Sequence, residues 1–136
     1  SWMPGPDGGF WLYVQGHGAL YRFLPETGYT KEMCADLTMD MGRYEQPTTS
    51  SVCEFVFLDR DTFITNCAGN IRQRDSLWLV KNGERTLIVE DYGANLSWPG
   101  DGYLYYTYRS MAPLDPCGDR NCRIKLDGSG WESLNW

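Results

Sequence analysis

The chain has 136 residues, enough for one ordinary domain with a hydrophobic core. Hydrophobic residues make up 42% of it and charged residues 22%, which argues against disorder throughout. The formal net charge of −6 argues against nucleic acid or an anionic membrane as the main partner, because both are bound by basic surfaces. No apolar run approaches the roughly 20 residues of a membrane-spanning helix.

Turn-forming and aromatic residues are abundant. The chain has 15 glycines and 7 prolines, and aromatic residues make up 15% of it. Aromatic side chains favour strands, whereas glycine and proline favour turns, so the composition predicts an all-β protein. The sequence contains no convincing helix: residues 35–41 could form a single helical turn, but Gly42 and Pro47 bound it.

The expected strands form three similar units in chain order: residues 1–49, 50–92 and 93–136. In the first unit we expect strands at 10–14, 20–23 and 29–33. In the second we expect them at 55–58, 62–65, 77–80 and 85–90. In the third, one strand ends at Trp98 and others follow at 103–108, 123–126 and from 131. Asn82-Gly83 is the clearest hairpin signal in the chain.

Several strands are apolar on successive residues, notably 10–14, 77–80 and 103–108. This pattern is typical of sheets that are covered on both faces. It predicts the antiparallel four-stranded blades of a β-propeller, in three blade-like units, with a β-sandwich as the alternative.

Two short motifs lead to a known family. Ser97-Trp98 is followed by Pro99-Gly100-Asp101-Gly102 and an aromatic strand, and Leu126-Asp127-Gly128-Ser129-Gly130 follows a later strand. Ser1-Trp2 and Asp7-Gly8 open the first unit in the same way. This pattern resembles the repeat of TolB-like β-propellers. The resemblance implies that each unit is one blade and that Trp2, Trp98, Asp7 and Asp101 are structural.

Three blades cannot close a ring, because propellers have four to eight. We therefore expect a larger ring, completed by more of the same polypeptide or by another copy, and not a closed monomer. Neither 1–14 nor 122–136 has the composition of a polar cap, so both terminal sheet faces are expected to need cover. The chain begins at Ser1 without a signal-peptide pattern, which predicts a processed chain or a piece of a longer one.

Five cysteines in a short chain favour an oxidising compartment, so we expect an extracellular or periplasmic protein. We predict one disulfide between Cys117 and Cys122 and another between Cys53 and Cys67, with Cys34 buried and free. Spacing alone does not fix this connectivity. The four residues between Cys117 and Cys122 do not match redox or zinc motifs.

The sequence shows no catalytic set, and we expect no cofactor and no metal site. His17 is the only histidine and stands between two glycines, so a hydrolytic triad within this chain is not expected. Loops on a rigid scaffold are common binding sites. We expect partner binding by the connections 15–18, 36–49, 66–75 and 109–121, and specifically by His17, Tyr44, Arg72 and Arg74.

The function that we expect is a non-catalytic β-propeller scaffold or binding module, which mediates protein–protein interaction in an extracellular or periplasmic assembly. The alternative is the propeller portion of an enzyme, either a gate for a peptidase or a glycan-binding domain lined with aromatic side chains.

Overall fold

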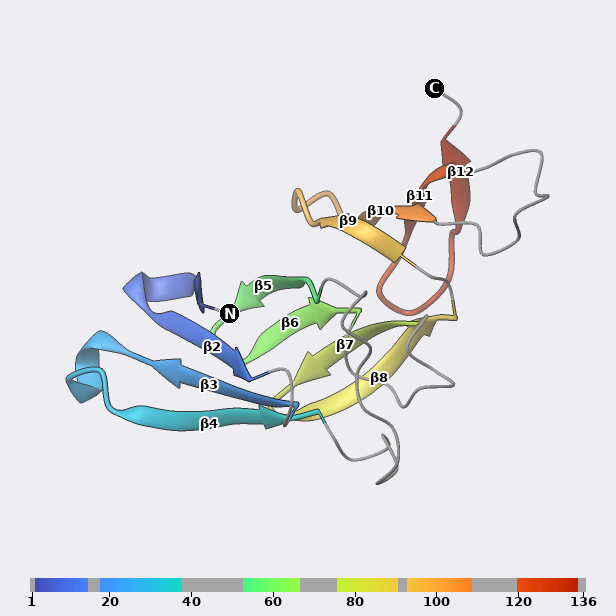
Figure 1. Ribbon diagram of the computed structural model, residues 1–136. Helices are drawn as coiled ribbons and strands as arrows, with labels where there is room; N and C mark the ends of the chain where they lie inside the picture. The colour runs from blue at the N-terminus through green and yellow to red at the C-terminus, as the bar shows by residue number, and fades with distance from the viewer. Residues whose placement is uncertain are drawn as a thin grey trace.

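The computed structural model describes residues 2–14, 18–37, 53–66, 76–90, 93–108 and 120–134. It contains three four-stranded antiparallel sheets (Figure 1). In each sheet the strands are hydrogen-bonded in chain order: β1-β2-β3-β4, β5-β6-β7-β8 and β9-β10-β11-β12. The prediction of an all-β protein with antiparallel four-stranded units is therefore confirmed.

The first sheet consists of β1 (Trp2–Pro4), β2 (Phe10–Val14), β3 (Ala19–Phe23) and β4 (Lys31–Asp36), with single 3-10 turns η1 (Pro6–Gly8) and η2 (Pro25–Thr27). The second consists of β5 (Phe55–Asp59), β6 (Thr62–Thr65), β7 (Leu77–Lys81) and β8 (Glu84–Val89). The third consists of β9 (Gly93–Ser97), β10 (Leu104–Tyr108), β11 (Arg120–Ile124) and β12 (Glu132–Leu134). The possible helical turn over residues 35–41 does not form at its start, because Ala35 and Asp36 pair with β3 as part of β4. Most of its remaining residues lie outside the described ranges.

The hairpin predicted at Asn82-Gly83 is present. Lys81 pairs with Glu84, so these two residues form the whole loop between β7 and β8. Both have positive φ, 53° at Asn82 and 81° at Gly83. Asparagine and glycine tolerate this conformation best, and it gives a turn whose twist matches that of the two strands.

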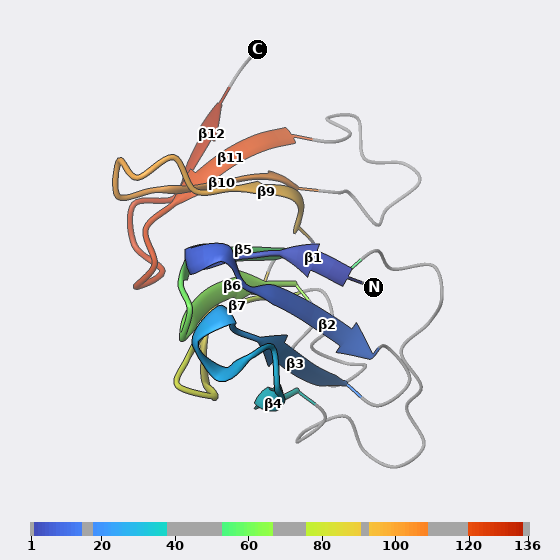
Figure 2. The same ribbon diagram turned by 90° about the vertical axis from the view of Figure 1, so that its left-hand side faces the viewer.

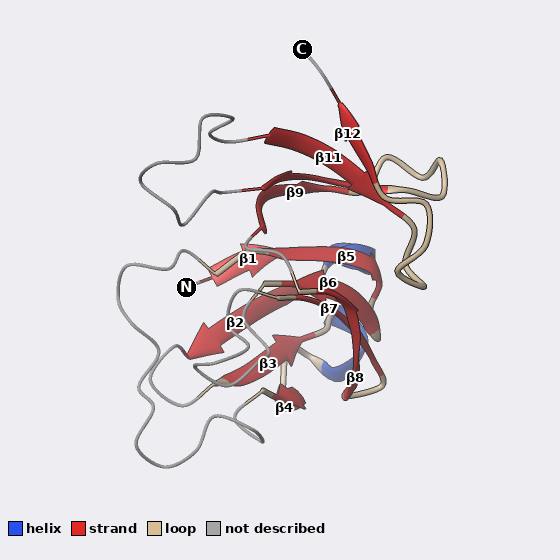
Figure 3. Cartoon of the chain, turned by 90° about the vertical axis from the view of Figure 1, so that its right-hand side faces the viewer, coloured by secondary structure: helices blue, strands red, loops and turns tan. Residues whose placement is uncertain are grey.

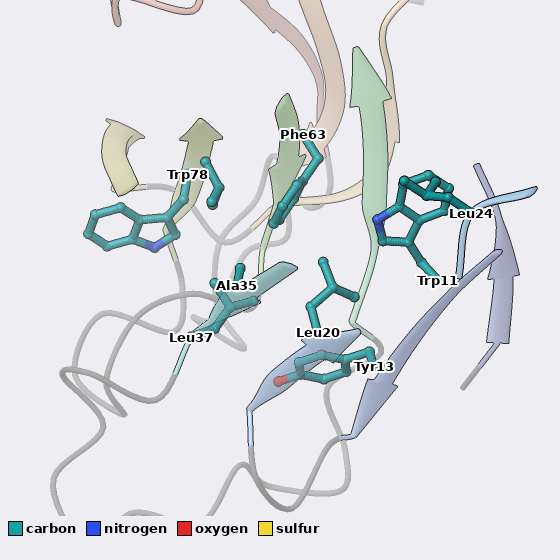
Figure 4. Packing of buried hydrophobic residues seen from close by; sticks show 9 residues of the cluster. Trp11, Tyr13, Leu20, Leu24, Ala35, Leu37, Phe63 and Trp78 are labelled. Atoms are coloured by element: carbon teal, nitrogen blue, oxygen red, sulfur yellow. The ribbon is translucent and has the colours of Figure 1, made fainter. Parts of the chain in front are cut away.

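The sheets stack in chain order and enclose two hydrophobic cores (Figure 2). The first core lies between β1–β4 and β5–β8 and includes Trp11, Leu20, Phe63 and Trp78 (Figure 4). The second lies between β5–β8 and β9–β12. Its members are Ile64, Leu77, Ile88, Leu104, Tyr106, Cys122 and Ile124.

Burial on both faces is most complete in the middle sheet. All four residues of β6 are buried. In β2 the burial alternates, with Trp11 and Tyr13 buried and Phe10 exposed, and in β10 Leu104 and Tyr106 are buried between half-buried neighbours. The prediction that 10–14 and 103–108 are covered on both faces is therefore wrong, because these strands belong to the outer sheets of the stack.

Consecutive strands of each sheet are antiparallel neighbours, so their connections lie at two distinct ends of the molecule (Figures 2 and 3). One end, here named the connection end, carries the last residues of β2, β6 and β10 and the first residues of β3, β7 and β11. These residues are Val14, Thr65, Tyr108, Ala19, Leu77 and Arg120. The opposite end carries η1, η2 and the hairpin at Asn82-Gly83.

Candidate binding site

A pocket of about 330 Å³ lies at the connection end. Among the described residues it is lined by Val89, Tyr108, Arg120 and Trp131. These residues end β8, end β10, begin β11 and directly precede β12. The pocket therefore lies where the second and third sheets meet. Its volume is at the lower end of the range of small-molecule sites.

The pocket residues are held by the strands around them. Tyr108 and Arg120 are paired across β10 and β11, so their side chains are neighbours on one face of the sheet. Trp131 donates from Nε1 to the hydroxyl of Tyr106, 2.9 Å away, and Tyr106 is itself buried in the second core. The indole is thus oriented by the core, although 46% of Trp131 is exposed.

The chemistry of this lining suits a ligand with a flat or apolar part and a negative charge. Trp131 and Tyr108 provide aromatic surface, and Arg120 provides a guanidinium group in the same pocket. Guanidinium groups match the geometry of carboxylates and phosphates, and an indole face is a platform for rings. The pocket contains no arrangement of nucleophile and base among its described residues.

Only part of this site was predicted from the sequence. Arg120 lies within the connection 109–121 that we predicted to bind, whereas Trp131 and Val89 were not among the expected site residues. The four predicted partner-binding residues, His17, Tyr44, Arg72 and Arg74, lie outside the described residues, so their role stays a prediction.

The cysteine predictions have different outcomes. Cys34 is a free thiol as predicted, although it is half-buried and not buried. Cys122 is a buried thiol whose Sγ lies 3.7 Å from the carbonyl oxygen of Arg120, so the structure lacks the expected disulfide with Cys117. The reason is its position, since it faces the second core from within β11.

Cys53 packs against the first core, and it is disulfide-bonded. Its predicted partner Cys67 lies outside the described residues, as does Cys117. The pairing of Cys53 with Cys67 therefore stays a prediction.

A largely but not fully buried arginine links the first two sheets. Arg22 of β3 donates to both carboxylate oxygens of its cross-strand neighbour Glu32, at 3.0 and 3.2 Å. Its Nη1 also donates to Asp61 Oδ1 at 2.6 Å and to the carbonyl oxygen of Arg60 at 2.9 Å, both in the turn between β5 and β6. Hydrogen bonding to Arg22 holds the pKa of Glu32 below its usual value.

Arg60 forms a second link between the same sheets. It donates to Asp7 of η1 at 3.0 Å and to Glu26 of η2. Arg60 and Asp61 therefore both pair with charged residues of the first sheet and its turns, which is a structural role.

Glu54 connects the second sheet to the third. Its carboxylate accepts hydrogen bonds from the backbone amides of Asn95 and Leu96, at 2.9 and 3.1 Å. Asn95 has a φ of 54° and lies where the register between β9 and β10 shifts. Glu54 thus satisfies two amides that the irregular strand leaves without a partner in its own sheet.

Comparison with known proteins gives no relative: no known protein family matches the sequence, and no curated protein is similar to it. The resemblance to TolB-like propellers therefore rests on the motifs quoted above. Within the described ranges no helix is long and apolar enough to cross a membrane. The same ranges hold no group of three or more His, Cys, Asp or Glu side chains that could hold a metal ion.

Proposed function

We propose that this chain is a non-catalytic scaffold or binding module of the β-propeller type, which captures a protein partner at its connection end in an extracellular or periplasmic assembly. The observation that carries this proposal is the pocket formed by Val89, Tyr108, Arg120 and Trp131. It lies where the predicted binding connection 109–121 leaves β10 and enters β11. A rigid sheet with variable connections is a common basis for such binding.

The stacking of the sheets supports the propeller type. The first strand of the second sheet, β5, contacts the first strand of the third sheet, β9, and the turn η1 of the first sheet. Each sheet meets the next through apolar faces, as blades of a propeller do. A sandwich has two such sheets facing each other, whereas here the middle sheet is covered on both faces.

The binding proposal is tested by placing a photo-cross-linking amino acid at Tyr108, within the pocket. The matched control carries it at Tyr103, which precedes the same strand at the opposite end. In a secreted or periplasmic extract of the source organism, we expect one protein to be captured from position 108 and not from position 103. That capture should weaken when His17, Tyr44, Arg72 and Arg74 are each replaced by alanine. Equal capture from both positions, or capture unchanged in all four variants, contradicts the proposal.

One observation favours a second function, a glycan site belonging to an enzyme. Trp131 presents a half-exposed indole in a pocket that also contains Arg120 and Tyr108, and sugar rings stack on such surfaces. If this is correct, acidic oligosaccharides quench the fluorescence of the wild-type chain but not that of Trp131→Phe. Absence of quenching in the wild type contradicts the glycan site and leaves the protein-binding proposal intact.

A further inference from the structure

The face of β1–β4 that points away from the first core is made of large apolar side chains. We name it the outer face of the first sheet, and its members are Trp2, Phe10, Leu12, Tyr21, Phe23 and Met33. The strand register places Trp2, Leu12, Tyr21 and Met33 in one row across the sheet, and Phe10 beside Phe23 in the next. Their neighbours in sequence, such as Trp11 and Leu20, point into the core, as the period of two requires.

Half of the members of this face are exposed. Trp2 is 64% exposed, Met33 55% and Phe10 48%, and the rings of Trp2 and Phe23 contact each other with centroids 5.2 Å apart. Isolated exposed apolar residues are common, but a continuous group across four strands marks a contact surface. In the middle sheet the corresponding face, which includes Phe63, Trp78 and Val80, is buried against β1–β4.

The other terminal face of the stack has a different chemistry. Most side chains of β9–β12 that point away from the second core are polar, and several of them are engaged with one another. Arg123 donates to Glu132 at 2.6 Å, and Thr107 donates to Asn121 at 3.1 Å. Tyr105 donates to Asp101 at 2.6 Å. The expectation that the chain lacks a polar cap at its C-terminal end is therefore wrong.

This asymmetry determines how two copies can associate. Head-to-tail packing, as in a ring made from two copies, would place the apolar outer face of the first sheet against the polar face of β9–β12. That arrangement buries polar groups against apolar ones, which is unfavourable. Like-to-like packing of the two apolar faces has no such cost, and it is the isologous arrangement that two-fold dimers use.

The charges on β4 fit a two-fold arrangement. Lys31 begins the strand and Asp36 ends it, and both are exposed. Lys31 lies at the outer face, with Nζ 4.3 Å from the ring centroid of Tyr21. A bulge between Met33 and Ala35 shifts the alternation in β4 by one residue. Asp36 lies between Ala35 and Leu37, which both belong to the first core, so it points to the same face as Lys31. The two residues are about 17 Å apart along an extended strand. If β4 of one copy runs antiparallel to β4 of the other, Lys31 of each approaches Asp36 of the other.

We propose that two copies of this chain associate through the outer faces of their first sheets, related by a two-fold axis that sets the β4 strands antiparallel. This dimer covers the exposed apolar row and pairs the two ends of β4. It leaves the pocket at the connection end outside the interface, so partner binding there does not depend on the dimer, whereas the dimer argues against a ring closed by two copies head to tail.

Sedimentation of the 136-residue chain at increasing micromolar concentration tests the dimer. We expect the wild type to dimerise and Met33→Glu to dissociate, with a dissociation constant raised at least about tenfold because a carboxylate would be buried in the interface. The matched control is Leu87→Glu, which changes an exposed leucine of β8 in the same way and leaves dimerisation unchanged. Circular dichroism establishes that each variant is folded.

A charge exchange tests the orientation and does not depend on the Met33 variant. Lys31→Glu and Asp36→Lys should each weaken the dimer, and the double variant should restore it. A wild type that stays monomeric at every concentration, or a dimer that Met33→Glu leaves intact, overturns the proposal. A double variant as weak as the two single ones overturns the antiparallel arrangement.

Discussion

Phe63 and Ile64 are consecutive residues of β6, and each is buried in a different core. Phe63 packs with the first sheet and Ile64 packs with the third. Successive side chains of a strand point to opposite faces, so this single step carries the chain from one core to the other. The same alternation occurs in β5, where Phe55 and Phe57 pack against the first core and Val56 against the second. The middle sheet thus holds the two outer sheets together.

Replacement of Phe63 by alanine is expected to destabilise the whole chain. The centroid of its ring lies 5.7 Å from the ring centroids of both Phe55 and Phe57. The substitution therefore removes two aromatic contacts and leaves a cavity. We expect the free energy of unfolding to fall by about 3–5 kcal/mol. Ile64→Val, which removes one methyl group from the other core, should cost about 0.5–1.5 kcal/mol. Urea denaturation measures both, and a loss below about 1 kcal/mol for Phe63→Ala contradicts this packing.

Replacement of Arg22 by methionine is expected to weaken the contact between the first two sheets. The side chain donates four hydrogen bonds, two to Glu32 and one each to Asp61 and the carbonyl oxygen of Arg60. Arg22 is largely buried, so we expect a loss of about 1–3 kcal/mol in unfolding free energy. Arg123→Met is the matched control, because Arg123 pairs with Glu132 at the solvent-facing side of the third sheet. Equal losses in the two variants would argue against a linking role for Arg22.

The same arginine predicts a dependence of stability on pH. Hydrogen bonds from Arg22 lower the pKa of Glu32 in the folded chain relative to the unfolded chain. The stabilisation is therefore fully present above the ordinary carboxyl pKa of about 4.3 and is lost as the pH falls through the lower folded value. We expect Glu32→Gln to lower the melting temperature at neutral pH and to reduce its decline in acid. A wild type and variant with parallel acid profiles contradict this coupling.

Local sequence signals predicted most strands because turns have short-range causes. Asn82-Gly83 is one example, and its positive φ values follow from the two residue types. The fourth strand of the first sheet was predicted to start at Tyr29 but starts at Lys31. The reason is that Gly28 and Tyr29 both have positive φ, and Thr30 Oγ1 bonds back to the carbonyl oxygen of Thr27. Together these features extend the turn by two residues.

Contacts between sheets could not be predicted from local patterns. Arg22 and Asp61 are 39 residues apart, and only the stacking of the sheets brings them together. The pocket has the same origin, since Val89 and Trp131 come from different sheets. The polarity of the face formed by β9–β12 was missed for a related reason. Aromatic residues are frequent in β10, but the register turns Leu104 and Tyr106 inward and leaves Tyr105 and Thr107 outside.

The two free thiols, Cys34 and Cys122, are expected to differ in their reactivity toward alkylating reagents. Cys122 is fully buried in the second core, whereas Cys34 is half-buried. Burial raises the pKa of the Cys34 thiol, and the thiolate is the form that reacts with alkylating reagents. In the folded chain we expect iodoacetamide to modify Cys34 slowly, and more quickly as the pH is raised. Cys122 should react only after unfolding, which mass spectrometry of the alkylated peptides measures.

Peptide mapping without reduction supplies the control for this experiment. After unfolding and alkylation we expect Cys53 to be found in one peptide linked to Cys67, and Cys122 to be found alkylated. A linked peptide containing Cys117 and Cys122 would contradict the free thiol of Cys122. Cys122 follows Arg120 by two residues in β11, and Arg120 pairs with Tyr108 at the pocket. The state of this one sulfur therefore also tests the strand that positions Arg120.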